Sequence, residues 1–404
     1  MESNRRGFLV SLASLAGAAT VVRTEAQGQH VHPAPSAATA KPVAQAVPRA
    51  TGVAGVVPVV TPDIPHLQPT MDGDVKVFRL VAEPVKTEFL PGRKVDAWGF
   101  NGSMPGPTIE VTEGDRVRLI VENRLPEYFA PHWHGLEVPI GQDGVPGISH
   151  PPIPPGGSHT YEFTLTQNGS FFYHSHMPMQ ELMGMIGWFI VHPKKAHEPR
   201  VDRDFGLIFQ GWDIRPDNTV PNTLAMEFNW LTINGKAGPA TTPLVVKKGE
   251  RVRVRLVNLS MDHHPVHLHG HTFYVTGTEG GRVKGSLDRE PGNTVIVGVA
   301  QSRDVEFVAH NPGDWMLHCH LPHHMMNQMV SMVGPMHGSG PGLNVPGYPQ
   351  DMWMPMDELA GNKPELYGLP QQWTGAMMGM MTLVRVLEPE MFERVQQLRR
   401  EALR

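Results

Sequence analysis

The stretch from His318 to Met329 constrains this chain more than any other, because it holds the only cysteine among 404 residues. It reads His-Cys-His-Leu-Pro-His-His-Met-Met-Asn-Gln-Met. A thiolate, two imidazoles and a weak axial thioether form the ligand set of an electron-transfer copper centre. Cys319, His324 and Met329 supply three of these four groups, so the second imidazole must come from elsewhere in the chain.

The two histidines that flank the cysteine are a second clue. Successive side chains of an extended strand point to opposite faces. Cys319 would then face one way, while His318 and His320 face the other. One short peptide is therefore able to contact two separate metal centres.

Three segments upstream also carry paired histidines. They are His132-Trp133-His134-Gly135, His174-Ser175-His176, and His264-Pro265-Val266-His267-Leu268-His269-Gly270-His271. In chain order, the four patterns HxHG, HxH, HPxHLHGH and HCHxxxHxxxxM resemble the copper-binding motifs of the multicopper oxidases. A single HxH pair is common by chance among 22 histidines, but four pairs, one enclosing the only cysteine, are not.

The chain contains an internal repeat that predicts two domains. Residues 107–118 align with residues 243–253, and each copy continues into an HxHG and then an HxH pattern. Short β-type runs alternate with Gly/Pro turns, which favours an all-β sandwich class. The resemblance implies two cupredoxin-like Greek-key β-sandwich domains in tandem, at residues 75–197 and 203–336.

The same resemblance implies which residues bind copper. Because Ser175 stands where the second copy has Cys319, only the second domain would hold the mononuclear type 1 copper. Four coppers per chain are expected. The type 1 ligands would be His264, Cys319 and His324 with Met329 axial; the type 2 ligands His132 and His267; and the type 3 ligands His134, His174, His176, His269, His318 and His320.

The activity implied by the resemblance is oxidation of a reducing substrate, one electron at a time, coupled to four-electron reduction of O2 to water. The reductant would be a phenol, an aromatic amine or a metal ion. Electrons would pass from the type 1 copper through Cys319 to His318 and His320. Asp143 matches an acidic position of two-domain laccases, and the resemblance implies a proton relay there; the alternative interpretation is a turn residue before Gly144.

A two-domain chain also implies an assembly. The oxygen-binding cluster needs histidine pairs from both domain types. By analogy with two-domain laccases, the first domain of one subunit would face the second domain of the next. Such a head-to-tail contact closes into a ring, and we expect a homotrimer with clusters at its interfaces.

The flanking segments differ in character from the domains. Residues 1–26 resemble a twin-arginine signal peptide, with Arg5 and Arg6 before a short apolar run, which predicts a periplasmic or secreted protein. Residues 27–74 are rich in Ala and Pro and are expected to form a flexible linker. Residues 337–404 form a Met-rich C-terminal extension that ends in a predicted short charged helix from residue 388.

Two alternatives to an oxygen-reducing enzyme of the laccase type stay open. Thioether sulfur suits cuprous ions, so the methionines are consistent with a cuprous oxidase or a copper-resistance protein; they are equally consistent with packing of irregular surfaces. A copper nitrite reductase would place its type 1 site in the first domain, and Ser175 argues against it. A net charge of −5 without a basic run argues against nucleic acid as a partner, and no apolar stretch reaches spanning length.

Overall fold

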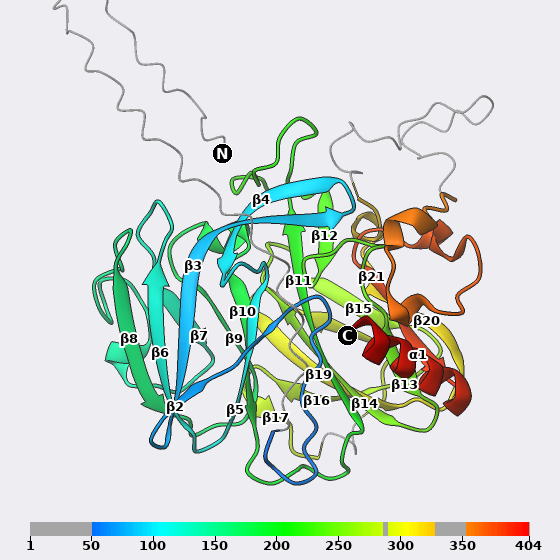
Figure 1. The fold of residues 1–404 in the computed structure, drawn as a ribbon, viewed down its shortest axis with the longest axis horizontal. Helices are drawn as coiled ribbons and strands as arrows, with labels where there is room; N and C mark the ends of the chain where they lie inside the picture. The colour runs from blue at the N-terminus through cyan, green and yellow to red at the C-terminus, as the bar shows by residue number, and fades with distance from the viewer. Residues whose placement is uncertain (1–50, 286–289, 328–352, 404) are drawn as a thin grey trace, which may run out of the picture. The chain divides into compact units, whose positions relative to one another are not determined.

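The computed structural model describes residues 51–285, 290–327 and 353–403, and these form two β-sandwiches in tandem (Figure 1). This confirms the predicted all-β class. Within the described residues, no helix has the length and apolar character needed to cross a membrane. Met329 and the signal-peptide prediction lie outside the described residues.

The first domain consists of two sheets that enclose a core of Phe, Val, Leu and Trp side chains. One sheet contains, in spatial order, β1 (His66–Leu67), β5 (Gly106–Thr112), β10 (Ile186–His192), β9 (Gly169–Ser175) and β7 (Pro131–His134). The other contains β2 (Thr70–Asp72), β3 (Val75–Leu90), β6 (Arg116–Asn123) and β8 (Ser158–Thr164), with β4 (Arg93–Phe100) paired to β3. Two 3-10 helices, η1 (Ile140–Gln142) and η2 (Gln180–Met183), lie in its loops.

The second domain repeats this plan. Its first sheet contains β13 (Leu244–Lys247), β21 (Met381–Leu387), β20 (Gly313–Cys319), β15 (His264–Leu268) and β18 (Thr294–Val297). Its second contains β12 (Trp230–Ile233), β11 (Arg203–Trp212), β14 (Arg251–Asn258), β19 (Gln301–Val308), β16 (Tyr274–Thr278) and β17 (Gly281–Arg282). The remaining elements are η4 (Pro322–Met325), η5 (Asp357–Ala360), η6 (Pro364–Leu366), η7 (Trp373–Ala376) and α1 (Pro389–Ala402).

Strand pairing makes the equivalence of the two domains explicit. In the first domain β5 pairs parallel with β10, and β10 and β7 each pair antiparallel with β9. In the second domain β13 pairs parallel with β21, and β21 and β15 each pair antiparallel with β20. Strand β21 is therefore the counterpart of β10, and β20 is the counterpart of β9.

The flexible linker predicted for residues 27–74 is wrong for its last part. Val59 and Ile64 are buried in an apolar cluster that also contains Trp188 of the first domain and Val257 of the second. Strands β1 and β2 also lie in this segment. Composition misled the prediction, because Pro-rich sequence suits an extended strap that packs between sandwiches as well as a free tether.

The separate C-terminal extension predicted from residue 337 is also wrong in part. Strand β21 lies between β13 and β20 inside the second domain, and all seven of its residues are buried. Helix α1, shown in red in Figure 1, packs Phe392 and Val395 against Val245 of β13. The domain therefore does not end at residue 336.

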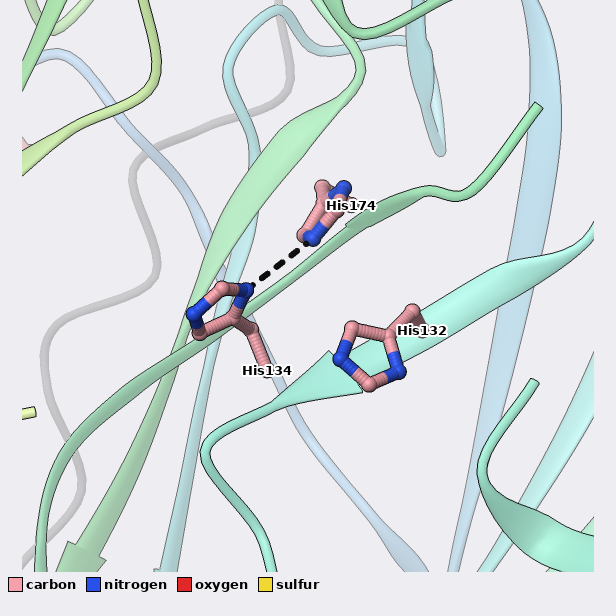
Figure 2. A group of neighbouring side chains, drawn as sticks. All are labelled: His132, His134 and His174. Atoms are coloured by element: carbon pink, nitrogen blue, oxygen red, sulfur yellow. Dashed lines mark hydrogen bonds between the residues drawn. The ribbon is translucent and has the colours of Figure 1, made fainter. Parts of the chain in front are cut away.

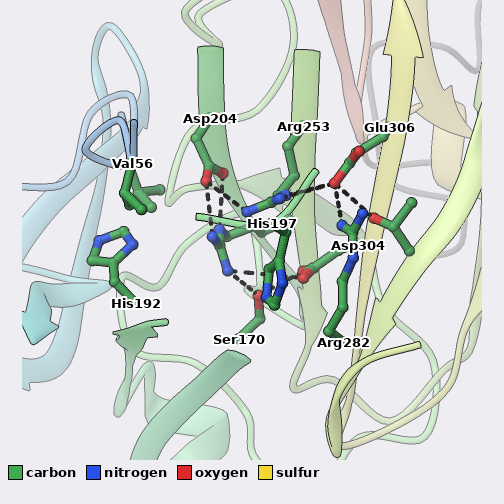
Figure 3. Close-up of polar contacts among 12 residues, drawn as sticks. Val56, Ser170, His192, His197, Asp204, Arg253, Arg282, Asp304 and Glu306 are labelled. Atoms are coloured by element: carbon green, nitrogen blue, oxygen red, sulfur yellow. Dashed lines mark hydrogen bonds and ion pairs between the residues drawn. The ribbon is translucent and has the colours of Figure 1, made fainter. Parts of the chain in front are cut away.

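A buried charge network joins the domains (Figure 3). Ser170 of β9 donates to Asp304 Oδ1 at 2.5 Å, and Arg255 donates to Ser170 Oγ at 2.7 Å and to Asp204 at 2.8 Å. Arg253 bridges Asp204 and Glu306 on the same face. Because this face of the second domain is covered, β14 buries Arg253 and Arg255, whereas β6 alternates buried and accessible positions.

Candidate metal centres

The first candidate centre lies in the core of the second domain, where β15, β20 and η4 bring together His264, Cys319 and His324. Cys319 Sγ is 3.6 Å from His264 Nδ1 and 3.5 Å from His324 Nδ1, and the two nitrogens are 3.2 Å apart. A triangle with these edges has its centre about 2 Å from each corner, which is a metal–imidazole or metal–thiolate bond length. Three of the four predicted type 1 ligands thus converge on one point, and these three form a group suited to a metal ion.

The chemistry of this triad fits copper. All three side chains are buried, and Cys319 is the free cysteine of the described residues. Burial lowers the pKa of His264 to about 3 and that of His324 to about 4, so both imidazoles are neutral at pH 7. Burial raises the pKa of the Cys319 thiol to about 12 in the copper-free protein. Its thiolate therefore needs a bound cation, and a soft sulfur with two imidazoles is a donor set that copper prefers.

Polar groups outside the triad orient its imidazoles, which is usual for metal-ligating histidines. His264 Nε2 lies 2.9 Å from Ser260 Oγ, and His324 Nε2 lies 3.3 Å from Asp262 Oδ2. The contact between His324 and Asp262 does not have hydrogen-bond geometry. Among the described residues His324 Nε2 therefore has no hydrogen-bond partner. Both contacts leave Nδ1 directed at the metal position.

Strand β20 also carries the predicted link to a second centre. Cys319 lies opposite Val266, and His318 lies opposite His267 on the neighbouring strand β15. Cys319 belongs to the apolar core, while the rings of His318 and His267 lie 5.6 Å apart on the other face. The expected alternation of faces is therefore present.

Four histidines gather on that other face, which we call the second-domain quartet: His267, His269, His318 and His320. His269 Nε2 is 3.1 Å from His318 Nε2, and the ring of His320 lies 5.5 Å from that of His267. His318 donates its Nδ1–H to the Cys319 carbonyl at 2.8 Å, and His267 donates its Nδ1–H to the Asn293 carbonyl at 2.8 Å. These donations use Nδ1 of His318 and His267 and leave their Nε2 atoms available to a metal.

The first domain holds an equivalent group, the first-domain quartet: His132, His134, His174 and His176. Figure 2 shows three of them, with His134 Nδ1 3.3 Å from His174 Nε2. His132, His134 and His174 form a group suited to a metal ion. Burial and neighbouring histidines lower the pKa of His134 to about 4 and that of His174 to about 3, so these imidazoles resist protonation.

Loop geometry fixes the first-domain quartet. His132 donates its Nδ1–H to the Asp143 carbonyl at 2.7 Å, and His174 donates its Nδ1–H to the Ser175 carbonyl at 2.8 Å. A Cβ at Gly144 would lie 1.7 Å from the Pro131 carbonyl oxygen, so only glycine allows the loop to approach β7 this closely. Sequence reasoning placed Asp143 near the cluster, and its Oδ1 is 3.5 Å from His132 Nδ1.

Two carboxylates near the predicted ligands were missed by sequence reasoning. Glu181 Oε2 lies 3.4 Å from His174 Nδ1, and burial raises the pKa of Glu181. Asp262 lies beside His324, as described above. The loop conformations place both carboxylates beside the histidines. Glu181 stands seven residues after His174, and Asp262 stands two residues before His264. This proximity in sequence was the only signal that could have identified them, and it is a weak one.

The two quartets are separate in the described part of the chain. Ring contacts join histidines within each quartet, and among these residues none joins one quartet to the other. The outer histidine of each quartet, His176 or His320, is exposed. Each quartet therefore has an open side.

Comparison with known proteins identifies the family. Models described as "Multicopper oxidase" match residues 82–196 and 213–335. The chain is 32% identical to a solved structure, the blue copper oxidase from Nitrosomonas europaea, with a TM-score of 0.58 over 63% of this chain and 81% of that chain. This chain belongs to the multicopper oxidases. Family membership implies copper as the metal of these centres.

Curated relatives of this chain include copper resistance proteins and laccases. Copper resistance protein A of Pseudomonas syringae pv. tomato is 36% identical over 145 residues, which is 36% of this chain and 24% of that protein. Laccase-19 of Oryza sativa subsp. japonica is 34% identical over 236 residues, which is 52% of this chain and 38% of that protein. The chain thus spans well under half the length of these relatives.

Proposed function

We propose that this multicopper oxidase takes single electrons from a small reductant and transfers them to O2, which is reduced to water. The observation that carries the proposal is the position of Cys319. Its side chain belongs to the buried triad, while its backbone carbonyl accepts the Nδ1–H of His318 in the second-domain quartet. A thiolate ligand of one centre is thus bonded, through a few backbone atoms, to a ligand of another.

Bound copper would supply the electron transfer at the triad and the oxygen reduction between the quartets, with four ions per chain. In this proposal His264, Cys319 and His324 hold the type 1 ion together with one thioether, which motif spacing alone would assign to Met329. His132 and His267 hold the type 2 ion, and the other six quartet histidines hold the type 3 pair. Backbone carbonyl acceptors orient four of these imidazoles, those of His132, His174, His267 and His318.

The open sides of the quartets support a homotrimer in which the first-domain quartet of one subunit meets the second-domain quartet of the next. Exposed apolar side chains lie near both quartets. Ile140 (67% exposed) and Ile148 (73%) flank the Asp143 loop, and Ile296 (64%) lies on β18, which pairs with the β15 strand of His267. In this proposal these side chains belong to the surface that the neighbouring subunit covers.

Proton delivery to oxygen is proposed for the two carboxylates beside the first-domain quartet. Asp143 is in contact with His132, and Glu181 is in contact with His174. Because burial raises the pKa of Glu181, this residue holds its proton to higher pH than an exposed glutamate and is suited to donate it.

Copper analysis, oxygen uptake and light scattering on the loaded protein test this function together. We expect four coppers per chain, intense blue colour, reductant-dependent O2 consumption and the mass of a trimer. One copper per chain without oxygen uptake would reject the oxidase, and a fully active, fully loaded monomer would reject the interfacial cluster alone.

A second candidate, cuprous oxidase, is favoured by the methionines around η4. Met326 and Met378 are buried together and pack against Met354 and Met356, which come from the C-terminal segment. Deleting that whole segment is not a usable test, because it removes β21 from the core. Instead, a Met354→Leu/Met356→Leu double variant should lower turnover of Cu(I) but not of a phenol or Mn(II). Equal turnover of all three reductants by variant and parent would reject this candidate.

Export by the twin-arginine route is proposed from the sequence of residues 1–26. The support is the Arg5-Arg6 pair before a short apolar run. Lysine at both positions should leave the protein in the cytoplasm in a fractionation experiment, and unchanged export would reject the route.

A further inference from the structure

We infer that Met380, which stands 61 residues after Cys319, provides the axial thioether of the type 1 centre. The inference rests on the type 1 copper of the proposed function. Motif spacing alone offers Met329, ten residues after Cys319 and outside the described residues. The fold offers Met380 on three independent grounds.

The first ground is the backbone around the triad. The Cys319 N–H donates to the Met380 carbonyl at 3.1 Å, and the Met380 N–H donates to the His324 carbonyl at 2.9 Å. Met380 is therefore hydrogen-bonded to two of the three triad residues. No other methionine of the described residues has this relation to the triad.

The second ground is the direction of the side chain. In the β20–β21 ladder His318 lies opposite Met381, so the next pair along the same register is Cys319 and Met380. Side chains of directly opposed residues lie on the same face of a sheet. Packing agrees, because Met380 is fully buried in the core cluster that contains Cys319, whereas Met381 packs in a different cluster with Met316.

The third ground is the first domain, which has the same arrangement without an insertion. There Ser175 occupies the cysteine position, and its N–H donates to the Met185 carbonyl at 3.2 Å. His174 lies opposite Ile186, as His318 lies opposite Met381.

The local sequences around these two methionines also match. Met-Gly-Met occurs at residues 183–185 and at 378–380, and in both copies the glycine has a positive φ, +112° at Gly184 and +63° at Gly379. Ser175 and Met185 are ten residues apart, which is the usual motif spacing. In the second domain the segment between η4 and β21 is about 50 residues longer than the segment between η2 and β10 of the first domain. Counting residues from the cysteine therefore points to Met329, whereas the position at the start of the paired strand points to Met380.

A close approach explains the glycine and fixes the geometry next to Met380. A Cβ at Gly379 would lie 2.4 Å from the His324 carbonyl oxygen and 2.8 Å from the Met326 nitrogen. The chain therefore passes directly against η4, which carries His324. This contact holds the start of β21 at the triad.

The test is the type 1 spectrum and reduction potential of three leucine variants in the copper-loaded full chain. Met380→Leu removes the thioether at nearly constant volume. We expect it to retain copper but to raise the reduction potential and change the copper hyperfine splitting in electron paramagnetic resonance, because the oxidised ion loses a sulfur donor. Met381→Leu, on the neighbouring residue and the other face, is the matched control and should leave both readouts unchanged, as should Met329→Leu.

Each outcome decides the inference. Unchanged spectrum and potential in Met380→Leu, or a changed spectrum and potential in Met329→Leu, would overturn it. If Met380→Leu does not fold, Met329→Leu still tests whether Met329 is the ligand. Met380→Gln keeps a donor atom at this position and is expected to lower the reduction potential. Absence of a type 1 spectrum in the unmodified protein would reject the proposed function instead.

Discussion

The two domains share one scaffold, yet among the described residues only the second gathers two imidazoles and a thiol in its core. Aligned by their histidine motifs, Phe129, Ser175 and Gln180 of the first domain occupy the positions of His264, Cys319 and His324. Phe129 is fully buried, and Ser175 donates its hydroxyl to Gln180 Oε1 at 2.7 Å. Three differences in sequence thus replace the proposed metal ligands by an apolar contact and a satisfied hydrogen bond.

The comparison separates what the fold provides from what the side chains provide. Both domains place an HxH pair at the end of a strand, and both orient its first histidine through the next residue's carbonyl. The quartets therefore belong to the shared scaffold. The triad belongs to the second domain alone, and Cys319 links it through the chain to the quartet of that same domain.

The largest effect is expected when the second domain is made to resemble the first at the cysteine. Cys319→Ser should abolish the blue colour and reduce reductant-dependent oxygen uptake to background, because a hydroxyl is a poor ligand for type 1 copper. The quartets should keep their copper. Blue colour or full oxygen uptake in this variant, measured by absorption and an oxygen electrode, would contradict the comparison.

The next largest effect, on the free energy of unfolding, is expected from breaking an arginine–glutamate ion pair that occurs at equivalent positions in both domains. Arg118 pairs with Glu162 on an accessible face, and Arg253 pairs with Glu306 at the equivalent ladder position beneath the first domain. Arg253→Met leaves Glu306 buried with less compensation and should cost about 3–5 kcal/mol of unfolding free energy. Arg118→Met should cost far less. Equal losses in urea denaturation would show that the domain interface does not bury this network.

Removing the negative charge of Asp143, beside the first-domain quartet, should affect a different property from removing that of Asp262, beside the triad. Asp143→Asn should reduce oxygen uptake about 10- to 100-fold and alter its pH profile, since Asp143 contacts a quartet histidine. Asp262→Asn should instead change the type 1 reduction potential and leave that pH profile in place. Full turnover with an unchanged pH profile in Asp143→Asn would exclude its proton role.

The stability of the copper-free protein should fall at acidic pH. His264 has a pKa of about 3 in the folded state, below its ordinary value near 6.5, so below pH 6.5 protons bind the unfolded chain preferentially. This histidine alone should cost about 2 kcal/mol between pH 7 and pH 5, with the loss ending near pH 3. Urea midpoints at the two pH values measure it, and His264→Gln should show a smaller fall; no fall in the parent would contradict the burial.

The smallest effect is expected when the first domain is given the cysteine of the second. Ser175→Cys should lose the hydrogen bond to Gln180 at a cost of about 1 kcal/mol. It should not create a second blue centre, because Phe129 and Gln180 offer no imidazole. An absorption spectrum with twice the blue intensity would refute this reading of the first domain.

The sequence predicted the all-β class and the grouping of its histidines and cysteine, because these ligands lie in short motifs at strand ends. His264 lies 55 residues before Cys319 and was predicted because its motif resembles one of the copper-binding motifs of the family. The buried strap at Val59 and Ile64 was missed, since its composition is that of a linker. Strand β21 was missed because a long Met-rich segment separates it from the domain it completes. Contacts such as Asp262 with His324 depend on loop conformation, which spacing does not specify.

Anaerobic reductive titration of the copper-loaded protein tests the central claim most directly. If Cys319 connects a type 1 centre to an oxygen-reducing cluster, each chain should accept four electrons, and the blue absorption should bleach along with the signals of the other coppers. Complete bleaching after a single electron per chain, with no further uptake, would contradict it.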